Sequence, residues 1–105
     1  MGSLYNLEMR IISRKVLREF WEQYPNAEQP LRSWLKNVKQ TTWKTPADIK
    51  NSYRSASFLA NNRVVFNIKG NHYRIVIAIK YQYSVVYIRF VGTHSEYDKI
   101  DATTV

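Results

Sequence analysis

The side chains best suited to chemistry lie near the C-terminus, in residues 89–101. His94, one of two histidines in the chain, follows an apolar run and a Gly-Thr pair, where a strand should end and a short helix begin. A histidine at such a junction can take up or release a proton near neutral pH, and the strand holds it in place. Tyr97 comes three residues later and is expected on a similar helix face. We interpret Glu96 and Asp98, in the same segment, as helix-end or structural acids.

The preceding strands are expected to place a basic face beside this histidine. Apolar residues alternate with other residues through 63–69, and Gly70-Asn71 fits a two-residue hairpin turn. The residue numbers of two opposite positions in such a hairpin add up to the same total along both strands, so Asn67 should pair with Arg74 and Lys69 with His72. The core face would then hold Val64, Phe66, Ile68, Tyr73, Ile75, Ile77, Ile79, Val86, Ile88 and Phe90. The opposite face would hold Arg63, Asn67, Lys69, His72, Arg74, Tyr87 and Arg89.

The charge pattern of that outer face points to an anionic partner. The chain contains no carboxylate between Ala56 and Ser95, whereas a solvated outer face normally mixes both signs of charge. We therefore favour an anion-binding face, with a plain solvent-exposed face as the alternative. Arg74 and Arg89, expected as diagonal neighbours across two strands, could grip one phosphate between them.

Cleavage of RNA requires little more than these side chains. Attack of a 2′-hydroxyl on the adjacent phosphate needs a base, cations for the developing charge and an acid for the leaving 5′-oxygen. His94 is the natural base or acid, and Tyr97 could stack on a nucleobase or share the proton transfer. The structural alternatives are a capping or hydrogen-bonded role for His94 and core packing for Tyr97.

Helices are expected to position this sheet. Ser13 can cap a first helix, which Pro25 ends, and Asn26 with Gln29 resembles a capping box for a second. Their apolar stripes are Val16, Leu17, Phe20, Trp21 and Tyr24, and then Leu31, Trp34, Leu35 and Val38. The segment Thr45-Pro46-Ala47-Asp48 predicts a third, short helix carrying Lys50 and Arg54, which could extend the basic surface or simply be solvated. The fold class is α+β, with two N-terminal helices on one face of a small twisted antiparallel sheet and a short C-terminal helix.

Length and composition limit the possible functions. The 105 residues suit one domain, which we expect to span residues 9–105 after a leader or tag-like extension at 1–8 that does not resemble a signal peptide. The absence of cysteine excludes disulfides and thiolate sites and fits a cytoplasmic location. We expect no metal site, no cofactor and no membrane span. A formal net charge of +8 favours a nucleic-acid partner.

Three separated motifs resemble the HigB-like toxins of the RelE superfamily. They are Trp43-Lys-Thr-Pro-Ala-Asp-Ile-Lys50, Asn62-Arg-Val-Val-Phe-Asn-Ile-Lys-Gly-Asn-His-Tyr-Arg74 and Gly92-Thr-His-Ser-Glu-Tyr-Asp98. The resemblance implies a RelE-like α+β domain and a type II toxin that cleaves messenger RNA in the ribosomal A site without a metal. It also implies a HigA-like helix-turn-helix antitoxin as partner, with operator DNA reached only through that antitoxin.

The resemblance also suggests roles for individual residues. By the family pattern, Arg74 corresponds to a phosphate-stabilising arginine, and His94 and Tyr97 correspond to the C-terminal pair used in proton transfer or base stacking. The predicted RNA contacts are Lys50, Arg54, Arg63, Asn67, Lys69, Asn71, His72 and Arg89. Among these, Arg89 depends on register alone and His72 could be incidental. The paired lysines that some relatives use as a base are missing.

Two other functions remain compatible with the sequence. One is a non-catalytic RNA- or DNA-binding module that uses the same cationic face. The other is a co-repressor subunit whose main task is to bind an antitoxin. Strand scission, or action in the absence of any partner, would separate the toxin from both.

Overall fold

The computed structural model describes residues 8–105, so most of the expected leader at residues 1–8 lies outside the described residues. Within them the chain forms the following elements in order: β1 (Arg10–Ile12), α1 (Arg14–Gln23), η2 (Pro25–Ala27), α2 (Glu28–Gln40), α3 (Pro46–Ser52), β2 (Ser57–Leu59), β3 (Arg63–Ile68), β4 (Tyr73–Lys80), η3 (Tyr81–Tyr83), β5 (Val85–Thr93) and α4 (His94–Tyr97). None of the described helices is long and apolar enough to cross a membrane.

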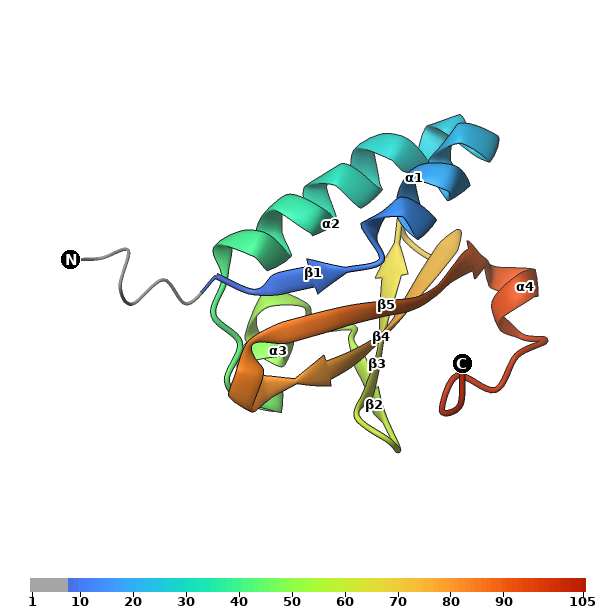
Figure 1. The fold of residues 1–105 in the computed structure, drawn as a ribbon. Helices are drawn as coiled ribbons and strands as arrows, with labels where there is room; N and C mark the ends of the chain where they lie inside the picture. The colour runs from blue at the N-terminus through green and yellow to red at the C-terminus, as the bar shows by residue number, and fades with distance from the viewer. Residues whose placement is uncertain (1–7) are drawn as a thin grey trace.

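The strands form one sheet in the order β1-β5-β4-β3-β2 (Figure 1). The strands β2 to β5 pair antiparallel, as predicted, whereas β1 pairs in parallel with β5. The expected α+β class is therefore confirmed, but the sheet is mixed and not wholly antiparallel. The segment before α1 alternates too weakly to reveal a strand. Its partner β5 lies more than seventy residues away in the chain, so no local pattern shows the pairing.

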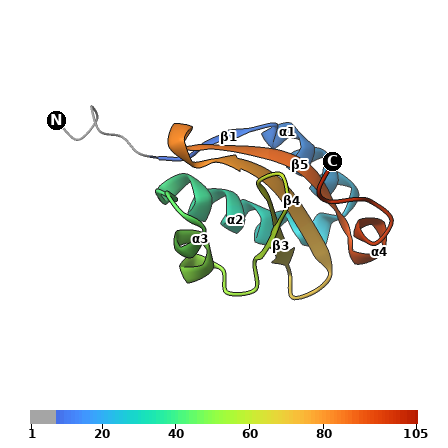
Figure 2. The ribbon, with the colours of Figure 1, turned by 90° about the horizontal axis from the view of Figure 1, so that it is seen from below.

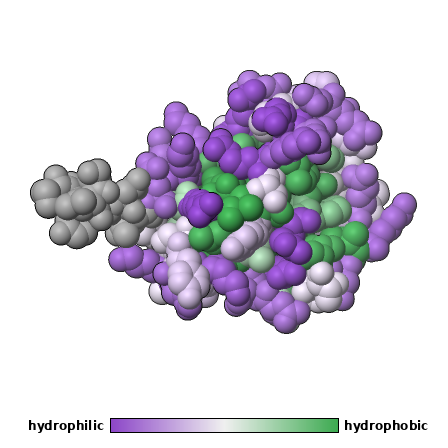
Figure 3. Space-filling view, viewed as in Figure 1, coloured by the Kyte–Doolittle hydropathy of each residue, from purple (hydrophilic) through white to green (hydrophobic). Residues whose placement is uncertain are grey.

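The helices α1, α2 and α3 supply their apolar side chains to one face of the sheet (Figures 1 and 2). Leu17, Leu31 and Val38 are fully buried there, and the Trp34 ring meets Phe66 of β3 edge-on at 5.4 Å. The predicted helical stripes are thus confirmed, except that Val16 is exposed. Figure 3 shows mainly hydrophilic residues over α1 and α2, on the surface turned away from the sheet.

Of the three predicted helix caps, Ser13 occupies the N-cap position of α1 without a capping bond, and the box of Asn26 and Gln29 is wrong. Ser13 adopts a left-handed backbone conformation with no capping bond from its side chain, and α2 begins after Ala27. Asn26 instead accepts a hydrogen bond from the Tyr73 hydroxyl. The third cap is confirmed, because Thr45 and Asp48 form a reciprocal capping box at the start of α3.

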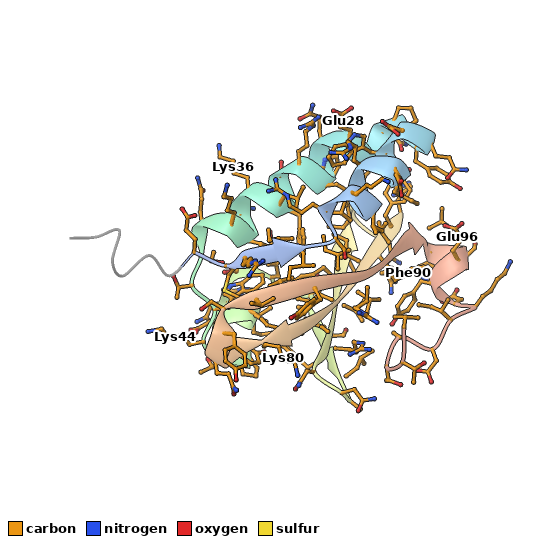
Figure 4. All side chains as sticks on the ribbon, viewed as in Figure 1. Glu28, Lys36, Lys44, Lys80, Phe90 and Glu96 are labelled. Carbon is orange, nitrogen blue, oxygen red and sulfur yellow. The ribbon has the colours of Figure 1, made fainter. Side chains whose placement is uncertain are left out.

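The predicted register of the β3–β4 hairpin is confirmed, with Asn67 opposite Arg74 and Val65 opposite Val76. The pairing of β4 with β5 changes register at a bulge, where Val76 faces Phe90 and Ile77 faces Ile88. Arg89 is the extra residue in this bulge, so Phe90 moves to the opposite face. The prediction of Phe90 as a core residue facing the helices is therefore wrong, and Figure 4 shows it beside α4 and the C-terminal segment.

A second, smaller apolar cluster lies on the outer face of the sheet. Val65 and Val76 pack there against Ala102, with Phe90, Tyr97, Leu59, Ile100 and Val105 around them. The C-terminal segment after α4 therefore folds back across part of the predicted cationic face. That face is narrower than expected, because apolar side chains occupy its middle.

Candidate active site

An open pocket of about 540 Å³ lies where β4 and β5 meet the β3–β4 turn and α4. It is lined by Tyr24, Lys69, Gly70, Asn71, His72, Tyr73, Thr93, His94 and Ser95. The lining contains one lysine, two histidines and no carboxylate residue. Four of the predicted site residues, Lys69, Asn71, His72 and His94, are brought together here.

The β3–β4 turn forms one wall of the pocket. Lys69 and Gly70 both have left-handed backbone conformations, which glycine adopts without strain. β3 ends at Ile68 and β4 begins at Tyr73, so Lys69 and His72 belong to the turn and not to the paired strands, although they lie opposite each other as predicted. The His72 amide donates to the Lys69 carbonyl at 3.2 Å, and the His72 ring nitrogen Nδ1 lies 2.9 Å from the same oxygen.

The opposite wall is the junction between β5 and α4. Thr93 and Glu96 form a capping box, with the Thr93 amide 2.8 Å from Glu96 Oε1, which confirms the structural role predicted for Glu96. His94 is the first residue of α4, and its amide donates to the His72 carbonyl at 3.1 Å. The His94 Nδ1 atom lies 3.1 Å from Asp98 Oδ2. Asp98 therefore orients the His94 ring, a role that goes beyond the structural one we expected.

Arg74 lies beside this pocket on β4 and is held by two neighbours. Its Nη2 atom donates to Asn71 Oδ1 at 2.7 Å, and its guanidinium lies 5.1 Å from the centre of the Tyr97 ring. The buried Nε atom has no partner among the described residues. Arg74 is thus a fixed cation whose position depends on the turn and on α4.

Gly92 makes this arrangement possible. It pairs with Arg74, and a Cβ atom there would lie 2.5 Å from the Phe90 ring and 3.0 Å from Glu96 Oε1. Glycine therefore lets the Phe90 ring cross the strand and reach Tyr97, with the two ring centres 6.5 Å apart.

Four predicted RNA contacts lie apart from this site. Arg63 and Arg89 both donate to the main-chain oxygen of Val105, and Lys50 donates to the Ala56 carbonyl at 2.8 Å. The predicted clamp of Arg74 and Arg89 does not form, because the bulge sets Arg74 opposite Gly92. Lys50 lies on α3 and Arg54 just after it, at the other end of the sheet from α4 (Figures 1 and 2).

Sequence reasoning missed several residues of the site. The helical spacing predicts Tyr24 in the core stripe of the first helix, yet it lines the pocket while its ring stacks on Phe20 at 4.6 Å. The pairing of His94 with Asp98 could have been predicted from their spacing of four residues in a helix. Ser95 carries no local signal of its place in the wall.

No group of three or more His, Asp or Glu side chains that could hold a metal ion occurs in residues 8–105. The pKa of Asp101 is lowered because the Thr103 hydroxyl and amide donate to its carboxylate. Burial raises the pKa of Tyr53 and of Tyr81. These three groups lie outside the pocket.

Comparison with known proteins identifies the family. Residues 27–100 match the family model of the HigB toxin, described as the RelE-like toxic component of a toxin-antitoxin system. The chain is 30% identical to the mRNA interferase toxin HigB of Escherichia coli K12 over 92 residues, which cover 86% of this chain and 88% of that protein. It is 28% identical to the mRNA interferase HigB of Escherichia coli O6:H1 over 94 residues, covering 88% and 91%. The family match extends from α2 to α4 and includes both walls of the pocket, and the chain belongs to the HigB toxin family, the RelE-like toxic component of toxin-antitoxin systems.

Proposed function

We propose that this toxin is an endoribonuclease that cleaves messenger RNA on translating ribosomes. The names of its relatives support an mRNA interferase activity. The observation that carries the proposal is that an oriented histidine, His94, and a fixed arginine, Arg74, lie at the same end of the β4–β5 pair, where Arg74 is opposite Gly92. These are the two kinds of group that transfer of an RNA phosphate requires.

His94 transfers a proton in the proposed reaction. Its Nδ1 atom is engaged by Asp98, which leaves Nε2 for the substrate. An acid behind an imidazole fixes the orientation of the ring and stabilises the positive charge that the ring carries when protonated. The side chain is 44% exposed, so RNA in the pocket can reach it.

Arg74 stabilises the negative charge that develops on the phosphate. A cation already in place at that point costs no reorganisation during the reaction, and removing such a group typically lowers the rate about 10²–10³-fold. Tyr97 acts as a positioning residue, because its ring supports the guanidinium of Arg74. Lys69 and Asn71 are the RNA contacts we retain in the turn, and Asn67, opposite Arg74 in the register, extends the same surface.

The proposed partners follow from the family and the charge. A HigA-like helix-turn-helix antitoxin would hold the toxin inactive, and operator DNA would be bound only through it. The ribosomal A site would present the message, which places the activity in the cytoplasm. A net charge of +8 suits a surface that meets ribosomal RNA. Attack by the 2′-hydroxyl needs an acid, a base and cations, so we expect the reaction to proceed without a metal.

A translating extract supplied with the purified toxin tests this function. We expect new 3′ ends in the message that carry 2′,3′-cyclic phosphate, and cleavage that persists when divalent ions are chelated after the ribosomes have been crosslinked. The variants His94→Ala and Arg74→Ala should lower the cleavage rate by at least about 10²-fold. Lys36→Ala, on the exposed surface of α2 (Figure 4), serves as the control. RNA binding without scission by the wild-type toxin would instead support a binding module.

A further inference from the structure

The second histidine of the chain lies in the same pocket as the first. His72 directly precedes β4 and His94 directly follows β5, and they are neighbours because Tyr73 pairs with Thr93 and the His94 amide donates to the His72 carbonyl. The proposed reaction needs two proton transfers on opposite sides of one phosphate, and the function above assigns only one.

The contacts of the two rings leave the same nitrogen available. A carbonyl oxygen can only accept a hydrogen bond, so the contact of His72 Nδ1 with the Lys69 carbonyl places the proton on Nδ1. The Nε2 atom of neutral His72 then carries a lone pair. His94 is anchored through Nδ1 in the same way, by Asp98.

We infer that His72 is the second catalytic residue, the base that removes the proton from the attacking 2′-hydroxyl, with His94 as the acid. This inference rests on the proposed ribonuclease function. The different partners of the rings set the roles. The carboxylate of Asp98 stabilises a positive His94 ring, whereas His72 faces a neutral carbonyl and shares its wall with the Lys69 ammonium.

Other hydroxyls and acids near the pocket are less suited to this step. The Tyr97 ring lies beneath Arg74 and packs into the apolar cluster of the outer face. The Tyr73 hydroxyl donates to Asn26. Glu96 is committed to the capping box. Of the residues that line the pocket, the two histidines are the ones whose side-chain type exchanges protons near neutral pH.

The bonds of the step balance without any further reactant. His72 Nε2 takes the proton of the 2′-hydroxyl as the 2′-oxygen forms a bond to phosphorus. The bond between phosphorus and the 5′-oxygen breaks, and the protonated His94 ring gives its Nε2 proton to that oxygen. The products are a 2′,3′-cyclic phosphate and a 5′-hydroxyl, with the two rings left in exchanged protonation states that solvent restores.

A substrate that needs no acid separates the two roles. We would measure single-turnover cleavage on programmed ribosomes of two messages, one natural and one with sulfur in place of the bridging 5′-oxygen at the mapped cut. A thiolate leaves without protonation, so His94→Ala should lose about 10²–10⁴-fold on the oxygen message and recover on the sulfur message. His72→Ala should lose a similar factor on both messages.

The variant His72→Gln is the matched control for position. Its amide can still donate to the Lys69 carbonyl, yet it cannot take a proton, so we expect it to be as slow as His72→Ala while thermal unfolding stays unchanged. Wild-type rates in His72→Ala, restoration by His72→Gln, or recovery of His72→Ala on the sulfur message would each overturn the assignment. Failure of the wild-type toxin to cut the oxygen message would instead refute the proposed ribonuclease function itself.

Discussion

The role of Tyr97 can be decided by two substitutions that remove different parts of its side chain. The Arg74 guanidinium lies 5.1 Å from the ring centre, within the range of a cation–π interaction, and no hydrogen bond of the Tyr97 hydroxyl occurs among the described residues. Tyr97→Phe keeps the ring and loses only the hydroxyl. Tyr97→Leu keeps apolar volume for the outer-face cluster but removes the aromatic face beneath Arg74.

The expected magnitudes follow from these contacts. A cation–π interaction at a partly exposed site contributes about 0.5–1 kcal/mol, which corresponds to about 2–5-fold in the population of correctly placed Arg74. Complete loss of a charge-stabilising group lowers the rate about 10²–10³-fold. We therefore expect the cleavage rate of Tyr97→Phe to stay within about 2-fold of wild type. For Tyr97→Leu we expect the cleavage rate to fall by more than about 2-fold and less than about 10³-fold.

A double-mutant cycle shows whether the two residues act as a unit. In the Arg74→Ala background, Tyr97→Leu should lower the single-turnover rate on programmed ribosomes by less than about 2-fold, because no guanidinium is left to position. Thermal unfolding of each variant checks that the fold is kept. If Tyr97→Phe were as slow as Tyr97→Leu, the hydroxyl would take part in the chemistry and the support role would be wrong.

Three further predictions concern the scaffold of the site. Gly92→Ala should destabilise the protein by about 1–3 kcal/mol in urea unfolding, because its Cβ would lie 2.5 Å from the Phe90 ring. The control Gly70→Ala places its Cβ near no atom within 4 Å, so it should show only the cost of its positive φ, about 1 kcal/mol. Equal losses of stability in the two variants would argue against the close approach of Phe90. Arg63→Ala should remove two of the three hydrogen bonds to the main-chain oxygen of Val105, leaving that of Arg89, and should speed amide exchange in residues 101–105. Arg54→Ala, an exposed control, should leave exchange there unchanged. The pKa of Asp101 is held below its ordinary value of 3.8, so the ionised carboxylate stabilises the last turn above pH 3.8, and this stabilisation is lost as the pH falls through the lowered pKa. Exchange of the Thr103 amide, corrected for its intrinsic rate, should therefore accelerate in that acidic range. A constant protection factor for this amide would contradict the prediction.

The parts of the fold that the sequence predicts well depend on local patterns. Leu17 and Trp34 are buried because helical spacing places them on one stripe, and the pairing of Asn67 with Arg74 follows from alternation around a Gly-Asn turn. The capping box of Thr45 and Asp48 is equally local. These interactions join residues close in sequence, so their signals lie within a short window.

The errors concern contacts between distant residues. The bulge at Arg89 leaves no mark in an otherwise regular strand, yet it transfers Phe90 to the other face and removes the expected clamp with Arg74. Ala102 covers Val76 from a segment without periodicity, so the sequence showed the outer face as more open than it is. Tyr24 enters the pocket because α1 ends beside β4, which no local pattern specifies.

The central claim is that an oriented His94 and a fixed Arg74 make this toxin a ribonuclease. The most direct measurement maps the 3′ ends of a message in a translating extract with wild-type toxin, His94→Ala and Arg74→Ala at equal amounts of folded protein. We predict cuts ending in 2′,3′-cyclic phosphate with the wild type and at least about 10²-fold less cutting with either variant. Undiminished cutting by both folded variants would contradict the account.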